Sequence, residues 1–367
     1  MKYRSKKMAL PLFFLLTSGV FVLALFPPIV APAKIANPMI MNGSQQQIAL
    51  EPAKRVVIFP PMLWSYLTVD EGAANVLAVS NFMHKEVANG LLGRIYPASM
   101  NIPTALTSGS NTAIPGDTEQ LLLLRPDAVF SWAHMSEPLK QAGLPVVEEK
   151  LGDSEQNTIS LWRLIATVAG KYDRGERLVS RYFEKRDAVE RGVAGLNAVE
   201  KPTAVFMWVN DFTSMFVAVG NSAFSRGLQI AGAKNLAAEF KLSRLNLEQL
   251  LMLNPDVIFL HGTFGKEQTP QFFYDQPELQ LLSAVKNKRV YKSPIGGSRM
   301  EGLVDEPLLQ SWMAELLYPD RLPNKFRDEC KETYREVYRY DLSDNEIDKA
   351  IFLQENLSSK GYNRFVR

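Results

Sequence analysis

The residue types in this chain best suited to bind a metal or a flat ligand are its three histidines and five tryptophans, spread over 367 residues. The histidines are His84, His134 and His261, and imidazole is the commonest metal ligand among side chains. They lie 50 and 127 residues apart (134 − 84 and 261 − 134), which excludes a local zinc-binding motif. A site that uses them together therefore has to be assembled by the fold.

All three histidines and three of the tryptophans follow predicted β-strands. Ligands of open α/β sheets bind beyond the carboxyl ends of the strands, so these positions are candidates for a ligand site. Arg299 follows the last predicted strand, and its planar guanidinium suits carboxylate or catecholate oxygens. Taken singly, a loop histidine is usually solvated and a tryptophan at a strand end usually packs. The candidate ligand-binding residues are Trp64, His84, Trp132, His134, Trp208, Asn210, His261 and Arg299.

The sequence lacks the common catalytic and nucleotide-binding signatures. It has no Gly-x-Ser-x-Gly elbow, no Gly-x-x-x-x-Gly-Lys-Ser/Thr loop and no His-Glu-x-x-His helix. Binding is therefore favoured over catalysis, and we expect no enzymatic activity. The alternative is a secreted metalloenzyme in which His84, His134 and His261 hold the metal and Asp211 or Glu301 acts as the general base.

Two segments of the chain repeat one pattern. Residues 119–132 and 248–261 share a Glu-Gln-Leu-Leu start, a central Pro-Asp and a closing apolar run, at a constant offset of 129 residues (248 − 119 and 261 − 132). Each segment predicts a short helix, a break at proline and a buried strand. The residues before the helices, Asp117 and Asn246, are suitable N-caps with a glutamine three residues later, as in a capping box. The repeat predicts two lobes of like topology.

The order of the predicted elements agrees with two lobes. Strands alternate with short helices over residues 54–157 and again over 197–300, which predicts two α/β lobes, each with a mostly parallel sheet flanked by helices. Residues 158–196 lack proline and carry apolar side chains at helical spacing. We expect one long helix there, or two nearly collinear helices around Gly170, that links the lobes; the alternative is two packed helices within one lobe. Residues 301–367 predict three terminal helices.

The N-terminus carries an export signal. Four basic residues within the first seven precede an apolar run over residues 8–26, and Ala31-Pro-Ala33 offers a small-x-small cleavage site. We expect a cleaved signal peptide at 1–33 and a flexible leader at 34–53; an uncleaved membrane anchor is the alternative. The single cysteine, Cys330, permits no intrachain disulfide, and no cysteine near the signal can carry a lipid anchor. With 41 basic and 39 acidic residues there is no basic stripe, so we expect no nucleic-acid partner.

From about residue 54 to 319 the chain resembles the helix-linked type III substrate-binding proteins of bacterial ABC importers, which serve ferric siderophores, haem and cobalamin. The resemblance depends on the opening Arg-Val-Val-Ile strand at 55–58, the two Glu-x-x-x-x-Leu-x-Pro-Asp segments, the linking helix, and the Ala-Gly-Ala-x-Asn stretch at 231–235. It implies a periplasmic protein with two α/β lobes joined by one long helix and a ligand groove between them. The three terminal helices extend beyond the usual end of the family.

The resemblance also implies partners and roles. Glu119 and Glu248 match the glutamates that dock onto arginines of the membrane permease; a favourable interaction with the helix dipole is their alternative role. We expect a monomer without a cofactor of its own, serving permease and ATPase subunits. Its ligand is expected to be a small-molecule metal chelate, iron first, with cobalamin, haem or a nickel chelate as alternatives. His84, His134 and His261 would face that metal. A sensor without a transport role is a third possibility.

Overall fold

The computed structural model describes most of the chain beyond its N-terminus. Residues 38–367 form one compact unit, and the predicted signal peptide lies outside the described residues. Within the described ranges no helix is both long and apolar enough to cross a membrane. Two short strands, β1 (Met39–Met41) and β2 (Gln47–Ala49), pair antiparallel inside the segment expected to be a flexible leader. The described residues are 39–41, 47–49, 51–60, 62–80, 90–104, 118–149, 154–195, 201–209, 215–217, 222–262, 269–294 and 304–367.

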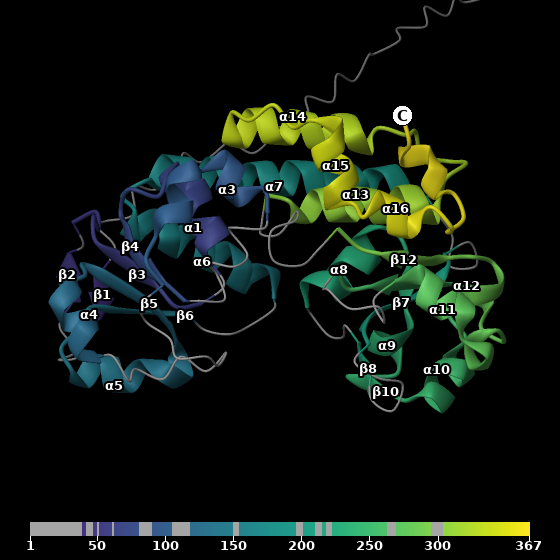
Figure 1. Cartoon of the computed structure of the whole chain (residues 1–367), viewed down its shortest axis with the longest axis horizontal. Coiled ribbons are helices and arrows are strands. Elements are labelled where there is room, and N and C mark those ends of the chain that lie inside the picture. Colours follow the sequence, from purple (N-terminus) through teal and green to yellow (C-terminus); the bar gives the residue numbers. More distant parts are fainter. Residues whose placement is uncertain are drawn as a thin grey trace, which may run out of the picture. The chain divides into compact units, whose positions relative to one another are not determined.

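The N-terminal lobe is built on a four-stranded parallel sheet in the order β4-β3-β5-β6 (Figure 1). Its strands are β3 (Val56–Ile58), β4 (Val76–Val79), β5 (Ala128–Trp132) and β6 (Val146–Glu149). Its helices are α1 (Leu63–Asp70), α3 (Leu92–Ile95), η1 (Pro97–Asn101), α4 (Thr118–Leu124), η2 (Ala133–Met135) and α5 (Ser136–Gln141).

The C-terminal lobe has a mixed sheet in the order β10-β8-β7-β11-β12, with β9 also paired to β7. The strands β7 (Thr203–Trp208), β11 (Val257–Leu260) and β12 (Val290–Lys292) are parallel, as expected. The other strands are β8 (Met215–Val217), β9 (Lys234–Asn235) and β10 (Arg244–Leu245). The helices are α8 (Ala223–Ile230), α9 (Leu236–Glu239), α10 (Leu247–Leu253), α11 (Pro270–Asp275), η4 (Pro277–Leu279) and α12 (Ser283–Lys286).

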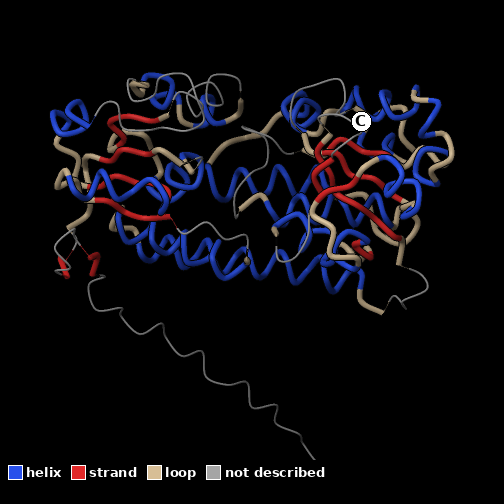
Figure 2. The backbone as a smooth tube through the Cα atoms, turned by 90° about the horizontal axis from the view of Figure 1, so that it is seen from below, coloured by secondary structure: helices blue, strands red, loops and turns tan. Residues whose placement is uncertain are grey.

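Successive residues of each strand point to opposite faces of its sheet, which divides the apolar side chains between separate clusters. In β7, Ala204 and Phe206 belong to a large cluster shared by both lobes, whereas Val205 and Met207 belong to a cluster of the C-terminal lobe alone. Strand β3 behaves likewise, since Val57 alone faces the smaller N-terminal cluster. Each sheet is therefore covered by apolar side chains of other elements on both faces. The strands of the N-terminal lobe and those of the C-terminal lobe form separate groups in Figure 2.

The structure confirms the repeat in local detail. Asn246 and Gln249 form the capping box that starts α10, whereas Asp117, the expected N-cap of the other copy, lies outside the described residues. The residue before each proline, Arg125 in one copy and Asn254 in the other, is left-handed, with φ of 45° and 42°. The aspartate of each Pro-Asp pair then fixes the start of the neighbouring central strand, because its carboxylate accepts a backbone N–H. Asp127 bonds Lys54 N at 2.9 Å, and Asp256 bonds Thr203 N at 2.8 Å.

The prediction of one helix, or two collinear helices, over residues 158–196 is wrong. Helix α6 (Glu155–Val168) and helix α7 (Tyr172–Val193) run antiparallel, with Arg163 on α6 paired to Glu176 on α7 at 2.7 Å. The chain reverses at Gly170, whose φ of +67° favours glycine and whose added Cβ would come 2.5 Å from Pro52. Helix α7 alone then leads into the C-terminal lobe.

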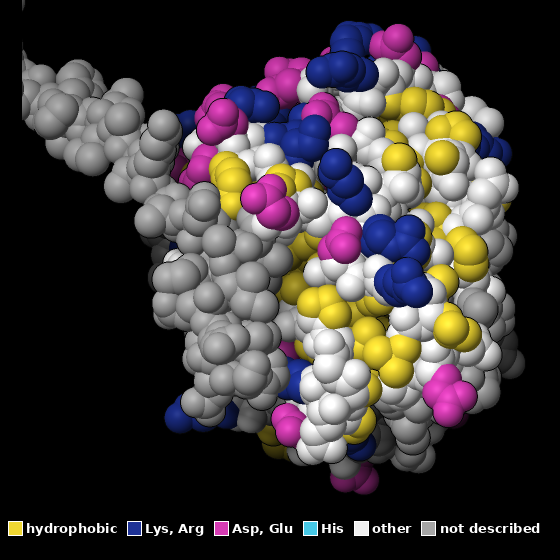
Figure 3. Space-filling model, turned by 90° about the vertical axis from the view of Figure 1, so that its left-hand side faces the viewer, with side chains coloured by type: hydrophobic (Ala, Val, Ile, Leu, Met, Phe, Trp, Pro, Cys, Tyr) yellow, Lys and Arg dark blue, Asp and Glu magenta, His cyan; other side chains and the backbone are white. Residues whose placement is uncertain are grey.

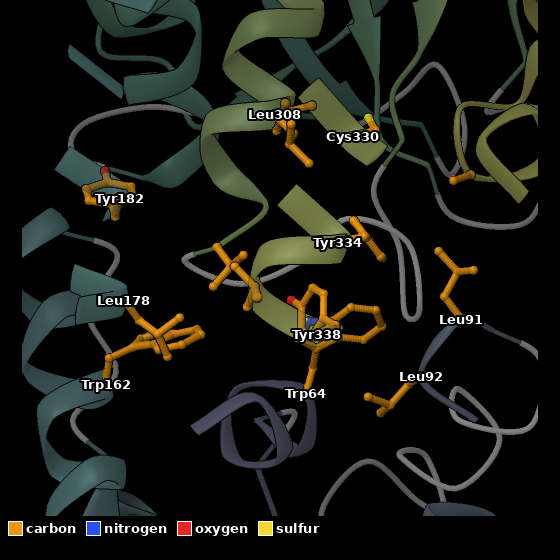
Figure 4. Packing of buried hydrophobic residues seen from close by; sticks show 14 of the residues in the cluster. Trp64, Leu91, Leu92, Trp162, Leu178, Tyr182, Leu308, Cys330, Tyr334 and Tyr338 are labelled. Atoms are coloured by element: carbon orange, nitrogen blue, oxygen red, sulfur yellow. Dashed lines mark hydrogen bonds between the residues drawn. The ribbon is translucent and has the colours of Figure 1, made fainter. Parts of the chain in front are cut away.

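The terminal helices make contacts with both lobes. Helix α13 packs on α7 and α8, and Asn356 of α16 bonds the backbone of Lys292 in edge strand β12 in both directions, at 2.7 and 2.9 Å. Helix α14 reaches the N-terminal lobe, where Tyr338 accepts a hydrogen bond from Trp64 Nε1 of α1 at 2.8 Å (Figure 4). These elements are α13 (Glu306–Leu317), α14 (Phe326–Tyr338), α15 (Asp344–Ala350), α16 (Leu353–Asn356) and η5 (Tyr362–Phe365).

Replacing Tyr338 with Phe should destabilise the protein, because the buried N–H of Trp64 loses its acceptor. We expect a loss of about 1–3 kcal/mol in the free energy of unfolding, measured by urea denaturation. Trp64→Phe in the same background should cost less than it does alone, since the two groups form one bond. Tyr172→Phe, at a 37% exposed position, is the control and should have little effect. An unchanged unfolding free energy in Tyr338→Phe would contradict this role.

Candidate ligand site

An aromatic cluster lies at the carboxyl ends of β7 and β11. Trp208 ends β7 and His261 directly follows β11, and because these strands are parallel neighbours the two side chains meet. Their rings are stacked, with centroids 4.8 Å apart and planes at 25°. Phe224, in the first turn of α8, stands edge-on to Trp208 at 5.3 Å and to His261 at 5.6 Å. The fold thus brings together two of the predicted site residues.

His261 is held in its neutral form. Burial lowers its pKa to about 4, because the charged imidazolium would lose its hydration. Its Nδ1 is buried and has no hydrogen-bond partner within the described part of the chain, while its backbone N–H donates to Met207 O at 2.9 Å. A neutral imidazole is the form that binds metals. The site therefore places a neutral imidazole beside a flat aromatic face.

The two other predicted tryptophans belong to the N-terminal lobe. Trp132 ends β5 as expected and is half-buried, packed with Met135 against the apolar cluster of the N-terminal lobe. Trp64 is only 6% exposed and lies in the shared cluster, at the contact with Tyr338. Because its indole N–H is already used in that contact, Trp64 here serves to join α1 to α14. Its expected place at a ligand groove stays a prediction.

Several predicted residues lie outside the described part of the chain. These are His84, Asn210 and Arg299, together with the proposed general bases Asp211 and Glu301 and the side chain of His134. Among the residues that the structure does describe, no three His, Cys, Asp or Glu side chains are placed to hold a metal ion. A three-histidine metal site therefore stays a prediction.

The two glutamates expected at a docking surface occupy equivalent exposed positions. Glu119 lies in the first turn of α4 and Glu248 in the first turn of α10. Where the structure describes their surroundings, neither carboxylate makes a hydrogen bond or an ion pair. The positive end of the helix dipole favours a carboxylate there. This effect acts within each helix separately, so it does not explain why a glutamate occurs at the same position in both lobes.

Sequence reasoning missed the phenylalanines of the aromatic cluster. Phe224 stacks on Phe206 at 4.5 Å with planes 7° apart, and Phe206 is completely buried beneath the site. Phe206 lies inside the apolar strand β7, where the residues of both faces are hydrophobic, so the sequence does not show which of them lie at the site. Phe224 had a usable signal, since it is the second residue of a helix that Ser222 caps at the same end of the sheet.

The sequence matches the profile of a known protein family. The profile of the periplasmic binding protein family matches residues 95–294, more than half of the sequence. The chain belongs to the periplasmic binding protein family. Its two α/β lobes are those of the type III, helix-linked members, which confirms the fold expected from the resemblance. Such proteins are the substrate-binding components of ABC importers.

Relatives of this binding protein are known in sequence and in structure. The molybdate-binding protein MolA of Haemophilus influenzae is 29% identical over 266 residues, which cover 62% of this chain and 73% of MolA. A periplasmic solute binding protein of Veillonella parvula is similar in fold, with a TM-score of 0.72, 22% identity, and coverage of 87% of this chain and 98% of that one. Helicobacter pylori CeuE, in a Ni-His complex, is also similar in fold, with a TM-score of 0.65 and 17% identity. The match covers 85% of this chain and 98% of CeuE.

The partly buried imidazole of His261 predicts a pH-dependent stability for this binding protein. Its pKa in the folded state, about 4, lies below the usual unfolded value near 6.5, so the unfolded chain binds more protons between these values. The contribution of His261 is fully present above about pH 6.5 and is lost as the pH falls towards 4. His261→Phe keeps the stacked ring but cannot bind a proton. When the pH falls from 7 to 5, its free energy of unfolding should therefore decrease by roughly 1–2 kcal/mol less than that of the wild type. Equal losses in urea denaturation would show that His261 is not desolvated.

Proposed function

We propose that this periplasmic binding protein captures a metal chelate, with a ferric siderophore or a similar iron chelate as the first candidate. It then delivers the chelate to the permease and ATPase subunits of its importer. The observation that carries the proposal is the neutral His261 stacked on Trp208 at the ends of β11 and β7. Its imidazole can fill an open coordination position of the metal, and the aromatic faces can cover the apolar surface of the chelate.

The relatives support a metal-containing ligand without fixing which one. MolA has been seen bound to molybdate, and CeuE in a Ni-His complex. Haem, cobalamin, nickel chelates and molybdate are therefore the competitors of an iron chelate in any binding test. Imidazole accepts iron, nickel and cobalt alike, so the chelator rather than the metal must supply much of the discrimination.

Fluorescence titration tests the ligand and the site together. We expect a ferric siderophore to quench tryptophan emission, because Trp208 lies against the proposed metal ligand, and Trp208→Phe to remove most of that quenching. His261→Phe should weaken binding of the ferric chelate about tenfold or more, the cost of one lost metal bond near 1.4 kcal/mol. The variant keeps an aromatic ring, so packing against Trp208 is preserved.

Two controls define this result. A gallium-substituted chelate should bind with an affinity similar to that of the ferric one, because Ga³⁺ and Fe³⁺ share charge and coordination geometry, whereas the metal-free chelator should bind wild type and His261→Phe equally. No response to any iron, nickel, cobalt or molybdenum ligand would overturn the site. Tight binding of bare Fe²⁺, Ni²⁺ or Zn²⁺ would instead favour a metalloenzyme.

The second part of the proposal concerns transfer to the membrane. Changing both Glu119 and Glu248 to Ala should abolish import while leaving ligand affinity intact, because both carboxylates are exposed and neither belongs to the cluster of Trp208, His261 and Phe224. Uptake in cells and ligand titration of the purified variant measure the two effects. Glu278→Ala, which removes an acidic residue outside the repeat, is the matched control. Import at the normal rate in the double variant would show that these glutamates do not dock.

A further inference from the structure

Two large apolar side chains are exposed at matching positions of the repeat. Leu123 on α4 is 81% exposed and Met252 on α10 is 84% exposed, again 129 residues apart (252 − 123). They are the two most exposed large apolar side chains in the described part of the chain. A single exposed leucine needs no functional explanation. The same exposure at the same position of both copies does need one.

Two other pairs of matching positions in the repeat have internal structural roles. Leu121 and Leu250 enter the cores of their lobes, with exposures of 1% and 0%. Asp127 and Asp256 hold the starts of the central strands through backbone hydrogen bonds. Folding thus explains why these positions recur. It does not explain the recurrence of an apolar side chain in solvent.

Each exposed apolar side chain stands next to a glutamate. Glu119 and Leu123 are four residues apart on α4, and Glu248 and Met252 are four apart on α10, so each pair lies on one face of its helix. On the side of the N-terminal lobe seen in Figure 3, apolar side chains reach the surface among charged ones. Each lobe therefore presents a carboxylate and an apolar side chain together, in the same order along the helix.

We propose that Leu123 and Met252 are the apolar anchors of the docking surface for the permease, each entering an apolar hollow beside a cationic group. The inference rests on the proposed function, in which Glu119 and Glu248 meet that partner. An apolar side chain in a fully desolvated pocket supplies affinity, whereas a charge at its side supplies orientation and association rate. The flexible thioether of Met252 suits a hollow of slightly different shape from that which receives Leu123.

The duplication also specifies the partner. Two equal patches on a repeated fold are best matched by a partner that presents one surface twice, which is what a two-fold symmetric pair of permease subunits does. A partner with a single binding surface would use only one of the patches. Both anchors should therefore contribute, and by similar amounts.

The test uses the full-length mature protein and its permease–ATPase complex in lipid nanodiscs. Leu123→Ala with Met252→Ala should weaken binding to the complex about a hundredfold, roughly tenfold for each side chain. Each single variant should lose about tenfold. The ligand affinity and the denaturation midpoint should not change, because both side chains lie in solvent. Leu281→Ala, at a 70% exposed position outside the repeat, is the control and should bind the complex as wild type does.

The outcomes separate this inference from the proposed function. If the double apolar variant binds the complex as tightly as wild type while Glu119→Ala with Glu248→Ala binds weakly, the anchors are wrong and the glutamate docking stands. If both double variants bind like wild type, the docking role fails as a whole. Loss in only one single variant would contradict a partner with two equivalent surfaces.

Discussion

One face of each sheet is buried in the same apolar cluster, and the two lobes depend on this shared layer. Helices α1, α6, α7, α13 and α14 supply it, with the completely buried rings of Trp162, Tyr182 and Trp312 among its largest members. Fully burying a single Val, Leu, Ile, Phe or Met side chain, of which the cluster contains many, stabilises a fold by about 1.5–3 kcal/mol. Pulling the lobes apart would return many of these groups to water at once. Neither lobe can therefore be treated as an independent domain.

Polar groups inside this layer are placed where elements of both lobes can satisfy them. Arg174 on α7 donates to the backbone carbonyls of Thr68 on α1 and Val337 on α14, at 2.8 and 2.9 Å. Glu306 on α13 accepts from Arg226 on α8 at 3.2 Å, although burial raises the pKa of its carboxyl. Unsatisfied buried groups are costly, so these bonds favour a single arrangement of the helices. Apolar burial supplies the stability of the layer, and the polar bonds supply its specificity.

The parts of the fold that the sequence predicted are those decided by neighbouring residues or by the pairing of parallel strands. The capping box at Asn246 follows from local energetics, and the meeting of Trp208 with His261 follows from two parallel strands ending side by side. The antiparallel turn at Gly170 agrees with the packing of the alternative, two packed helices, and not with the preferred prediction, because apolar spacing on two helices does not reveal whether the chain continues or reverses. The contact of Trp64 with Tyr338 joins residues 274 positions apart. No local pattern carries that information, so the sequence offered Trp64 only as a candidate ligand-binding residue.

The burial of Cys330 has a consequence for measuring how this molecule moves. The thiol is completely buried, and that burial raises its pKa well above the usual range, so the reactive thiolate is scarce and shielded from reagents. The chain contains no other cysteine. Any cysteine introduced at the surface would be the single reactive thiol, and one placed on each lobe would give a labelled pair without first removing a native residue. The distance between lobes, with and without ligand, can thus be followed by spectroscopy in an otherwise unaltered protein.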